Sequence, residues 1–570
     1  MVVMIKHALG FVALFPAILA AQAGQASAPD ITIRATTRLV QVTVVALGKR
    51  GVPARDLQRE SFRVYDEGKP QQISFFSLDT PAPVPAAGEA RKAGGPTAAV
   101  GPHVFSNRRD VVSGPGTSTV ILIDRVNTGW NDQIRAAEAI IGFLRQTQSE
   151  DRIGIYVHWP GSLQILYEVT QDSSELVKHL AAWKPDVGET SGRASSLQGS
   201  NFIQAMSDIS RPYSDSGDED GLRRFARTAS RGPNGSDSHM ADRAEISLKL
   251  FGAIANHLAA IPGRKSLIWV SAGFVRSALD YPAMQDTVRL LNGANVALYA
   301  VDARGLLTLQ GDATVGPVTS AAGGGGRGAG GVRVARRIAR TNNVLLVRTQ
   351  VPMLELSAPT GGRAFLNTND IQGAIRTAAK EADVTYTLGF YPASPQHDGR
   401  FHRIEVKVAG RPDVSVRYRK GYVDAPDPAN DSQGRTAAIR DAAWSPLDAT
   451  AVALSAEVVP AGGTDHYDVR LRIDPRTLDI RPEQDRLGGR ADVILVQEDH
   501  EGGQYDQVID TLVLALKPDT YQRALTEGLE YSHALQPNPK ANELRVIVRD
   551  AFSGNIGSLT IPFRAFRVRQ

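Results

Sequence analysis

Short, uninterrupted apolar runs separated by helically spaced residues constrain the fold of this chain most. The runs at 118–124 (STVILID) and 265–271 (KSLIWVS) are continuous rather than alternating, as in parallel strands covered on both faces. Between them, Ile134, Ala137 and Ile141 recur at helical spacing. Strands and helices that alternate in this way predict an α/β fold with a doubly wound, mainly parallel sheet.

Alternating apolar residues on both sides of this section predict two flanking β-sandwiches. Within the α/β section, polar and glycine-rich stretches predict mobile insertions at 207–242 and 320–331. The expected organisation is a small β-sandwich module at 30–80, a linker at 81–116, the α/β domain at 117–392, a β-hairpin extension at 393–424, a linker at 425–437 and a C-terminal β-sandwich at 438–570.

The first residues have the pattern of a secretory signal peptide. Lys6 precedes a short apolar run at 8–20, and small residues follow in A-x-A order at 21–23 and 26–28. We therefore expect cleavage of residues 1–28 and a secreted or periplasmic protein. The run is too short to span a bilayer comfortably, so no stable membrane span is expected after cleavage.

Composition narrows the classes of partner and site. A formal net charge of +4 with interspersed acidic and basic residues does not predict a nucleic-acid partner. The chain has no cysteine, which excludes disulfides, thiolate metal sites and cysteine nucleophiles.

Several motifs together resemble a known family. FRVYDEGKPQQISFF, GRKSLIWVS, NVALYAVDARG and LSAPTGGRAF, followed by YTLGFYP, FHRIEVKV and RYRKGY, resemble the acidobacterial VWFA-related family of exported proteins. The resemblance covers residues 37–422. It implies a von Willebrand factor A-type sheet whose partners bind at the carboxyl ends of the parallel strands, where open α/β sheets place their ligands.

The resemblance also implies a divalent-cation site built from oxygen ligands. In such domains an Asp-x-Ser-x-Ser turn, a loop Thr and a second Asp hold the ion. Asp124 matches the first Asp, and Val126 replaces the first Ser. Thr128 stands for the second Ser, Ser200 for the Thr and Ser271 for the second Asp.

Only one of two expected carboxylates remains in this degenerate site. Binding of Mg²⁺ or Ca²⁺ is therefore expected to be weak or absent, because ligand charge tunes affinity. The alternative is that Asp124 caps a turn or a helix N-terminus and nothing binds.

Four residues beyond the strand ends are candidates for contact with a partner: Asn127, Trp130, Trp159 and Phe274. Large aromatic residues at such positions are favoured interface anchors. The alternative is that they are partly buried packing residues.

No catalytic motif was found, so an enzyme is not predicted. HExxH and GxSxG are absent, and the GxGxxG at 326–331 follows no strand. The sequence predicts an exported binding or scaffold protein for another protein or a cell-envelope polymer. The alternative is an exported hydrolase using Ser271, His158 and Asp124 on the same face, which a nucleophile–base pair within about 3 Å would favour.

Overall fold

The structure is a computed structural model, and unit Arg38–Gln570 is described here. The described residues are 39–79, 103–108, 118–147, 152–159, 162–170, 235–276, 281–306, 346–381, 383–392, 400–423, 431–462, 465–499 and 503–566.

A six-stranded sheet carries the candidate site, with strand order β11-β10-β9-β6-β7-β8. Five strands run parallel, and β8 pairs antiparallel with β7. The strands are β6 (Ser118–Asp124), β7 (Arg152–Trp159), β8 (Ser162–Thr170), β9 (Lys265–Ser271), β10 (Val296–Asp302) and β11 (Ala364–Phe365).

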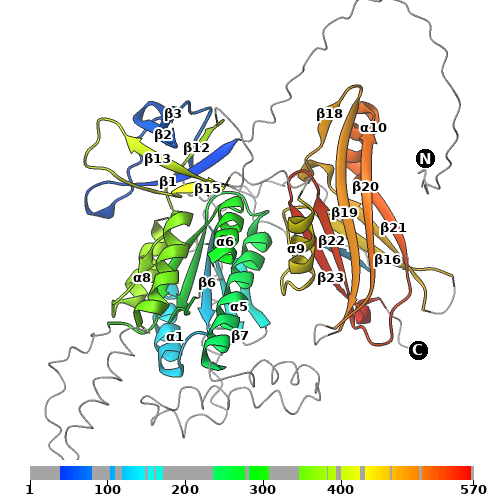
Figure 1. The fold of residues 1–570 in the computed structure, drawn as a ribbon, viewed down its shortest axis with the longest axis horizontal. Coiled ribbons are helices and arrows are strands. Elements are labelled where there is room, and N and C mark those ends of the chain that lie inside the picture. The colour runs from blue at the N-terminus through cyan, green and yellow to red at the C-terminus, as the bar shows by residue number, and fades with distance from the viewer. Residues whose placement is uncertain are drawn as a thin grey trace, which may run out of the picture. The chain divides into compact units, whose positions relative to one another are not determined.

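Helices lie against both faces of this sheet (Figure 1). Side chains of α1 (Trp130–Leu144) and α8 (Ile371–Lys380) pack on one face. Side chains of α5 (Gly235–Leu258) and α6 (Tyr281–Gly293) pack on the other. Every residue of β6, β9 and β10 is therefore buried, which explains why these strands read as continuous apolar runs.

The expected fold class, a doubly wound and mainly parallel von Willebrand factor A-type sheet between two sandwiches, is wrong. Most described strands lie in small antiparallel sheets, and the sheet expected to be parallel is mixed. No strand is expected from the sequence at β8, whose first residue, Ser162, pairs with Trp159 at the end of β7. Antiparallel neighbours need only such a short turn, whereas parallel neighbours need a crossover.

The first β part combines segments from both sides of the six-stranded sheet in the chain. Its two four-stranded sheets have the orders β14-β1-β12-β4 and β15-β13-β2-β3 and share one apolar core. The module expected at 30–80 is therefore completed by β12, from the end of the domain expected at 117–392, and by the extension expected at 393–424. The strands are β1 (Val40–Leu47), β2 (Phe62–Asp66), β3 (Lys69–Gln71), β4 (Phe75–Asp79), β12 (Thr385–Phe390), β13 (Phe401–Val408), β14 (Ser415–Tyr418) and β15 (Gly421–Val423).

The C-terminal part contains two antiparallel sheets around a second apolar core. One has the order β21-β17-β16-β5, and the other has the order β18-β19-β22-β23 with β20 paired to β19. β5 comes from the linker expected at 81–116, where its backbone pairs with β16. The elements are β5 (Val104–Ser106), α9 (Ser432–Ala443), β16 (Leu454–Pro460), β17 (Tyr467–Ile473), β18 (Arg481–Glu483), β19 (Arg486–Glu498), β20 (Gln504–Leu516), α10 (Pro518–Glu527), β21 (Leu529–Leu535), β22 (Glu543–Asp550) and β23 (Ile556–Pro562).

Some expectations fall outside the described residues. These are the signal peptide at 1–28, the insertion at 320–331, most of the insertion at 207–242, and Ser200. The last residues of the insertion expected at 207–242, namely 235–242, belong to α5.

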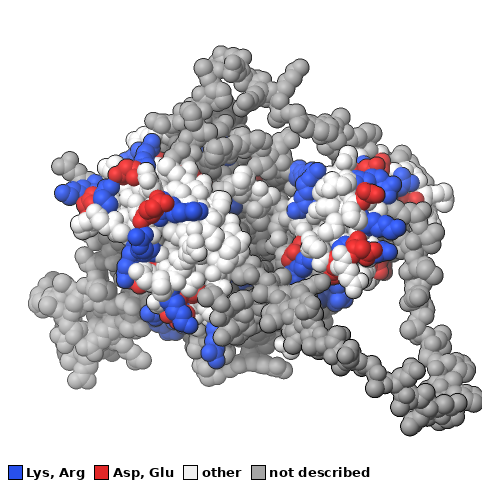
Figure 2. All heavy atoms as spheres, turned by 90° about the horizontal axis from the view of Figure 1, so that it is seen from above, with Lys and Arg blue, Asp and Glu red and all other residues white. Residues whose placement is uncertain are grey.

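No helix in the described part of the chain combines the length and apolarity needed to cross a membrane. Figure 2 shows one face of the molecule, and acidic and basic side chains are interleaved on the described part of that surface.

Candidate functional site

Four polar side chains form a row along the carboxyl edge of the six-stranded sheet. His158 is the penultimate residue of β7, and Asp124 is the last residue of the neighbouring β6. Ser271 and Asp302 end β9 and β10, and the register pairs them directly. All four are at most 2% exposed, so each needs hydrogen-bond partners inside the protein.

The Asp124 carboxylate accepts five hydrogen bonds. Its Oδ1 accepts from the backbone N–H of Asn127 at 3.1 Å and from Nδ1 of His158 at 3.1 Å. Its Oδ2 accepts from the Asn127 side-chain amide at 2.8 Å, from Nε1 of Trp269 at 2.9 Å and from Oγ of Ser271 at 2.8 Å. An ionised carboxylate only accepts, so Nδ1 of His158 carries the shared proton.

These donors keep Asp124 ionised although it is buried. Burial alone raises its pKa, but the hydrogen bonds from His158, Asn127 and Trp269 and the charge of His158 lower the pKa to about 2. Hydrogen bonds to the charged form of an acid stabilise that form. Asp124 is therefore a carboxylate at neutral pH, with its charge directed at groups of the protein itself.

The three described residues expected to bind a cation, Asp124, Thr128 and Ser271, do not fit a divalent ion in this arrangement. Both oxygens of Asp124 would have to give up protein donors, and Ser271 already donates its proton to Asp124. Oγ1 of Thr128 accepts the backbone N–H of Ala272 at 3.2 Å. Within the described ranges no group of three or more His, Cys, Asp or Glu side chains could hold a metal. The geometry matches the alternative, in which Asp124 organises the turn after its strand.

The row also lacks the order of a nucleophile, a base and an orienting acid. Asp124 lies between Ser271 and His158 and binds both, whereas a catalytic triad places the histidine between the other two. Ser271 is fully buried. The carboxylate that accepts its proton has a pKa of about 2, far below the neutral value that suits a general base.

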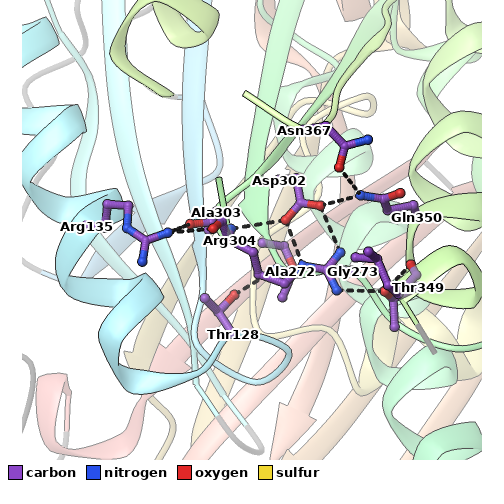
Figure 3. A network of polar contacts seen from close by, with 12 residues as sticks. Thr128, Arg135, Ala272, Gly273, Asp302, Ala303, Arg304, Thr349, Gln350 and Asn367 are labelled. Atoms are coloured by element: carbon purple, nitrogen blue, oxygen red, sulfur yellow. Dashed lines mark hydrogen bonds and ion pairs between the residues drawn. The ribbon is translucent and has the colours of Figure 1, made fainter. Parts of the chain in front are cut away.

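A second buried carboxylate, Asp302, binds the loop that follows its own strand (Figure 3). Arg304 forms a two-pronged pair with it, with Nε 2.8 Å from Oδ1 and Nη2 2.8 Å from Oδ2. The Gln350 side-chain amide donates to Oδ2 at 2.8 Å. Nη1 of Arg304 continues to Oγ1 of Thr349 at 2.9 Å. Asp302 thus joins the 303–306 loop to the helical segment 346–357.

The same network joins the loops after β6, β9 and β10 (Figure 3). Thr128 holds Ala272, as described above, and the backbone N–H of Gly273 donates to Oγ of Ser271 at 2.9 Å. From α1, Nη1 of Arg135 donates to the carbonyl of Arg304 at 2.6 Å. The described residues of the loops after β6, β9 and β10 are therefore held by contacts within the protein.

The four candidate partner contacts differ in how available they are. Phe274 is 3% exposed and packs against Trp269, with ring centroids 5.6 Å apart, so its prediction as a contact residue is corrected to a core residue. The Asn127 side chain is engaged with Asp124 and with Ser247. Trp130, the first residue of α1, is half-buried.

Trp159 is also half-buried, and its ring lies under the guanidinium of Arg125 at 3.5 Å. Its Nε1 donates to Gln164 on β8 at 3.2 Å. The ring is thus held in one orientation at the carboxyl edge.

Trp269, Asp302, Arg304 and Gln350 are not among the site residues expected from the sequence. Asp302 had a detectable signal, because it ends a continuous apolar run as Asp124 does. Trp269 lies inside such a run and looked like packing, and Gln350 lies far from Asp302 in the chain. Only tertiary contacts show their roles.

Comparisons with known proteins give little further information. No family model matches the chain, and no curated protein matches it. The crystal structure of the TFIIH p34 N-terminal domain aligns with 46% of this chain and 96% of that chain, at 13% identity and a TM-score of 0.18. A likeness at that score carries no argument about this chain.

Proposed function

We propose that this chain is an exported binding or scaffold protein that contacts another protein or a cell-envelope polymer through the carboxyl edge of its six-stranded sheet. The observation that supports this proposal is that polar side chains bind the described residues of the loops after β6, β9 and β10 to one another. A surface fixed before binding loses less conformational entropy when a partner docks.

The chemistry of the edge favours binding over hydrolysis. Asp124, Ser271 and Asp302 in its polar row bind groups of the protein itself, and the described residues of the row include no activated nucleophile. Trp159, held by Arg125 and Gln164, supplies an oriented aromatic surface of the kind that anchors interfaces. The motif resemblance to exported VWFA-related proteins is a second, independent support.

A tryptophan comparison tests the proposed surface. The mature protein is immobilised and exposed to periplasmic and envelope fractions of its host, and each retained component is then purified and its Kd measured. Trp159→Ala should weaken binding about thirtyfold, since truncation of an interface anchor costs about 2 kcal/mol or more. Trp444→Ala is the matched control, because Trp444 is 59% exposed and lies just after α9.

Two results would contradict the proposal. One is an equal Kd for wild type and Trp159→Ala with every retained component. The other is hydrolysis of ester or amide substrates that Ser271→Ala abolishes, which would support the hydrolase instead.

Export is part of the proposal and has a separate test. Mass spectrometry of the protein recovered from outside the cytoplasm should find an N-terminus within residues 24–29, following one of the two A-x-A sites. Recovery of full-length protein from the cytoplasm alone would contradict it.

A further inference from the structure

A small polar pocket lies away from the carboxyl edge, where β1 meets the α6–β10 segment and the turn between β14 and β15. The space inside it is about 20 Å³, and it is partly open to solvent. The lining includes Gln41, Thr43, Arg264, Asn295 and Arg419, and no acidic residue.

The segments that line the pocket contact one another directly. Oγ1 of Thr43 on β1 donates to the side-chain oxygen of Asn295 at 2.9 Å. Gly361 has a φ of +79°, and a Cβ built there would lie 3.0 Å from the backbone nitrogen of Arg419. These contacts hold the segments that line the pocket against one another.

Both arginines of the pocket have unused hydrogen-bonding capacity. Arg264 is 2% exposed, and its Nη2 donates to the Gly361 carbonyl at 2.9 Å and to the Tyr299 hydroxyl at 3.4 Å. The buried Nε atoms of Arg264 and Arg419 have no acceptor in the described part of the chain. A buried donor without an acceptor is unfavourable, and most so when it carries charge.

Positive charge exceeds negative charge around the pocket. Glu381 already pairs with Arg363 at 2.7 Å and with Arg417 at 2.5 Å. Neither Glu381 nor these two arginines lines the pocket, whose own residues include two arginines and no acidic side chain. Burial lowers the pKa of Arg419 to about 10, as expected for a cation held away from water without a counter-ion.

We infer that this pocket binds a small oxyanion of the phosphate type. Guanidinium groups match the geometry of phosphate oxygens and bind them through charge-assisted hydrogen bonds. Such an anion would accept the free N–H groups of Arg264 and Arg419 and balance their charge. The space of about 20 Å³ is far below the roughly 300–1,000 Å³ of pockets for drug-sized ligands, so the ligand is an ion or one anionic group of a larger molecule. This inference does not depend on the proposed partner-binding function.

Calorimetry and thermal unfolding of the mature protein test the inference. The protein is prepared in phosphate-free buffer and titrated with inorganic phosphate, with ionic strength held constant by chloride. Phosphate should bind at one site and raise Tm in proportion to its saturation. Glycerol 3-phosphate is titrated in parallel, and binding of that ester would identify the anionic group of a larger molecule as the ligand.

Three variants locate the site. Arg419→Gln should weaken phosphate binding at least tenfold, and Gln41→Glu should do the same by placing a carboxylate at the exposed mouth. Gln41→Glu keeps the test decisive if Arg419→Gln fails to fold, since Gln41 is exposed. Lys420→Gln is the matched control, because Lys420 is the neighbouring exposed cation and packs over Tyr418 at 4.1 Å; its affinity should equal that of wild type.

Two outcomes overturn the inference. One is that neither phosphate compound binds at concentrations on the order of 10 mM, which would mean that the pocket holds water only. The other is binding that all three variants retain, which would place the anion elsewhere.

Discussion

At the scale of the residue, Asp124 shows how a buried charge is tolerated. Its five donors come from the following loop, from two neighbouring strands and from the backbone. A buried carboxylate is stable only when such partners replace its lost hydration. The side chain therefore couples β6 to β7 and β9 as well as closing its own turn.

Asp124→Asn should lower the free energy of unfolding by about 3–5 kcal/mol, because an amide presents an N–H₂ group to donors that need an acceptor. Chemical denaturation measures the change. Glu138→Gln, on the exposed side of α1, should change stability by no more than about 0.5 kcal/mol. Equal stability of Asp124→Asn and wild type would contradict the hydrogen-bond arrangement.

Divalent cations should not stabilise the protein through Asp124, because its oxygens are occupied by protein donors. Thermal unfolding in millimolar Mg²⁺ or Ca²⁺ should give the same Tm as in their absence. A site filled to a hundred times its Kd would add about 2.7 kcal/mol. A cation-dependent rise in Tm that Asp124→Ala abolishes would refute this expectation.

Lys265 gives the stability a pH dependence of known sign. The residue is 3% exposed, and burial lowers its pKa to about 7; its Nζ donates to the Ile261 carbonyl at 2.7 Å. Between pH 7 and the ordinary lysine value the unfolded chain holds one more proton, so stability rises with pH in that window.

Lys265→Met should remove this rise and stabilise the protein at pH 7 and below. The expected gain is about 1.4 kcal/mol for each pH unit between the folded-state pKa of Lys265 and its ordinary value. Denaturation curves of both proteins from pH 6 to 10 provide the measurement. Parallel pH profiles would show that the amine stays charged in the folded state.

At the scale of the element, the loop after β9 depends on a close backbone approach. Gly273 has a φ of +73°, and a Cβ there would lie 2.2 Å from the carbonyl oxygen of Thr349. This contact brings the 346–357 helical segment against the loop that Ser271 and Thr128 hold. Only glycine permits both the backbone conformation and the approach.

Gly273→Ala should therefore cost clearly more than Gly410→Ala. Gly410 has nearly the same φ, +72°, but open space around it, so its substitution reports conformational strain alone, about 1 kcal/mol. The difference between the two free energies of unfolding isolates the steric contact. Equal costs would mean that the helical segment moves away freely.

At the scale of the whole molecule, strands far apart in sequence form shared cores. β1 pairs with β12 and β14, although more than 300 residues separate them. The six-stranded sheet is thus inserted, along the chain, within a β part that closes only after residue 400. Such pairing makes the folding of this part depend on contacts with large loop-closure cost.

Leu388→Ala should therefore speed amide hydrogen exchange in β1 as much as in β12. Leu388 is fully buried on β12 and pairs with Val42, and truncation of such a leucine costs about 2–5 kcal/mol. Exchange in β16 and β17 should not change, since they belong to a separate core. Leu471→Ala, in that core, is the reciprocal control, and slow exchange of β1 in Leu388→Ala would contradict a shared opening unit.

The sequence by itself determined the buried strands β6 and β9, the helical spacing of α1 and the strand-end positions of Asp124 and Ser271. Apolar periodicity reports burial within one segment, and an acidic residue at the end of a buried run stands out in any order of strands. The pairing of β1 with β12, the antiparallel return of β8 and the addition of β5 to the C-terminal sheet were decided only in three dimensions. The same holds for the five donors of Asp124, which no spacing predicts. The most distant donor lies 147 residues away. Whether a carboxylate meets a cation or protein donors depends on which side chains the packed strands bring to it.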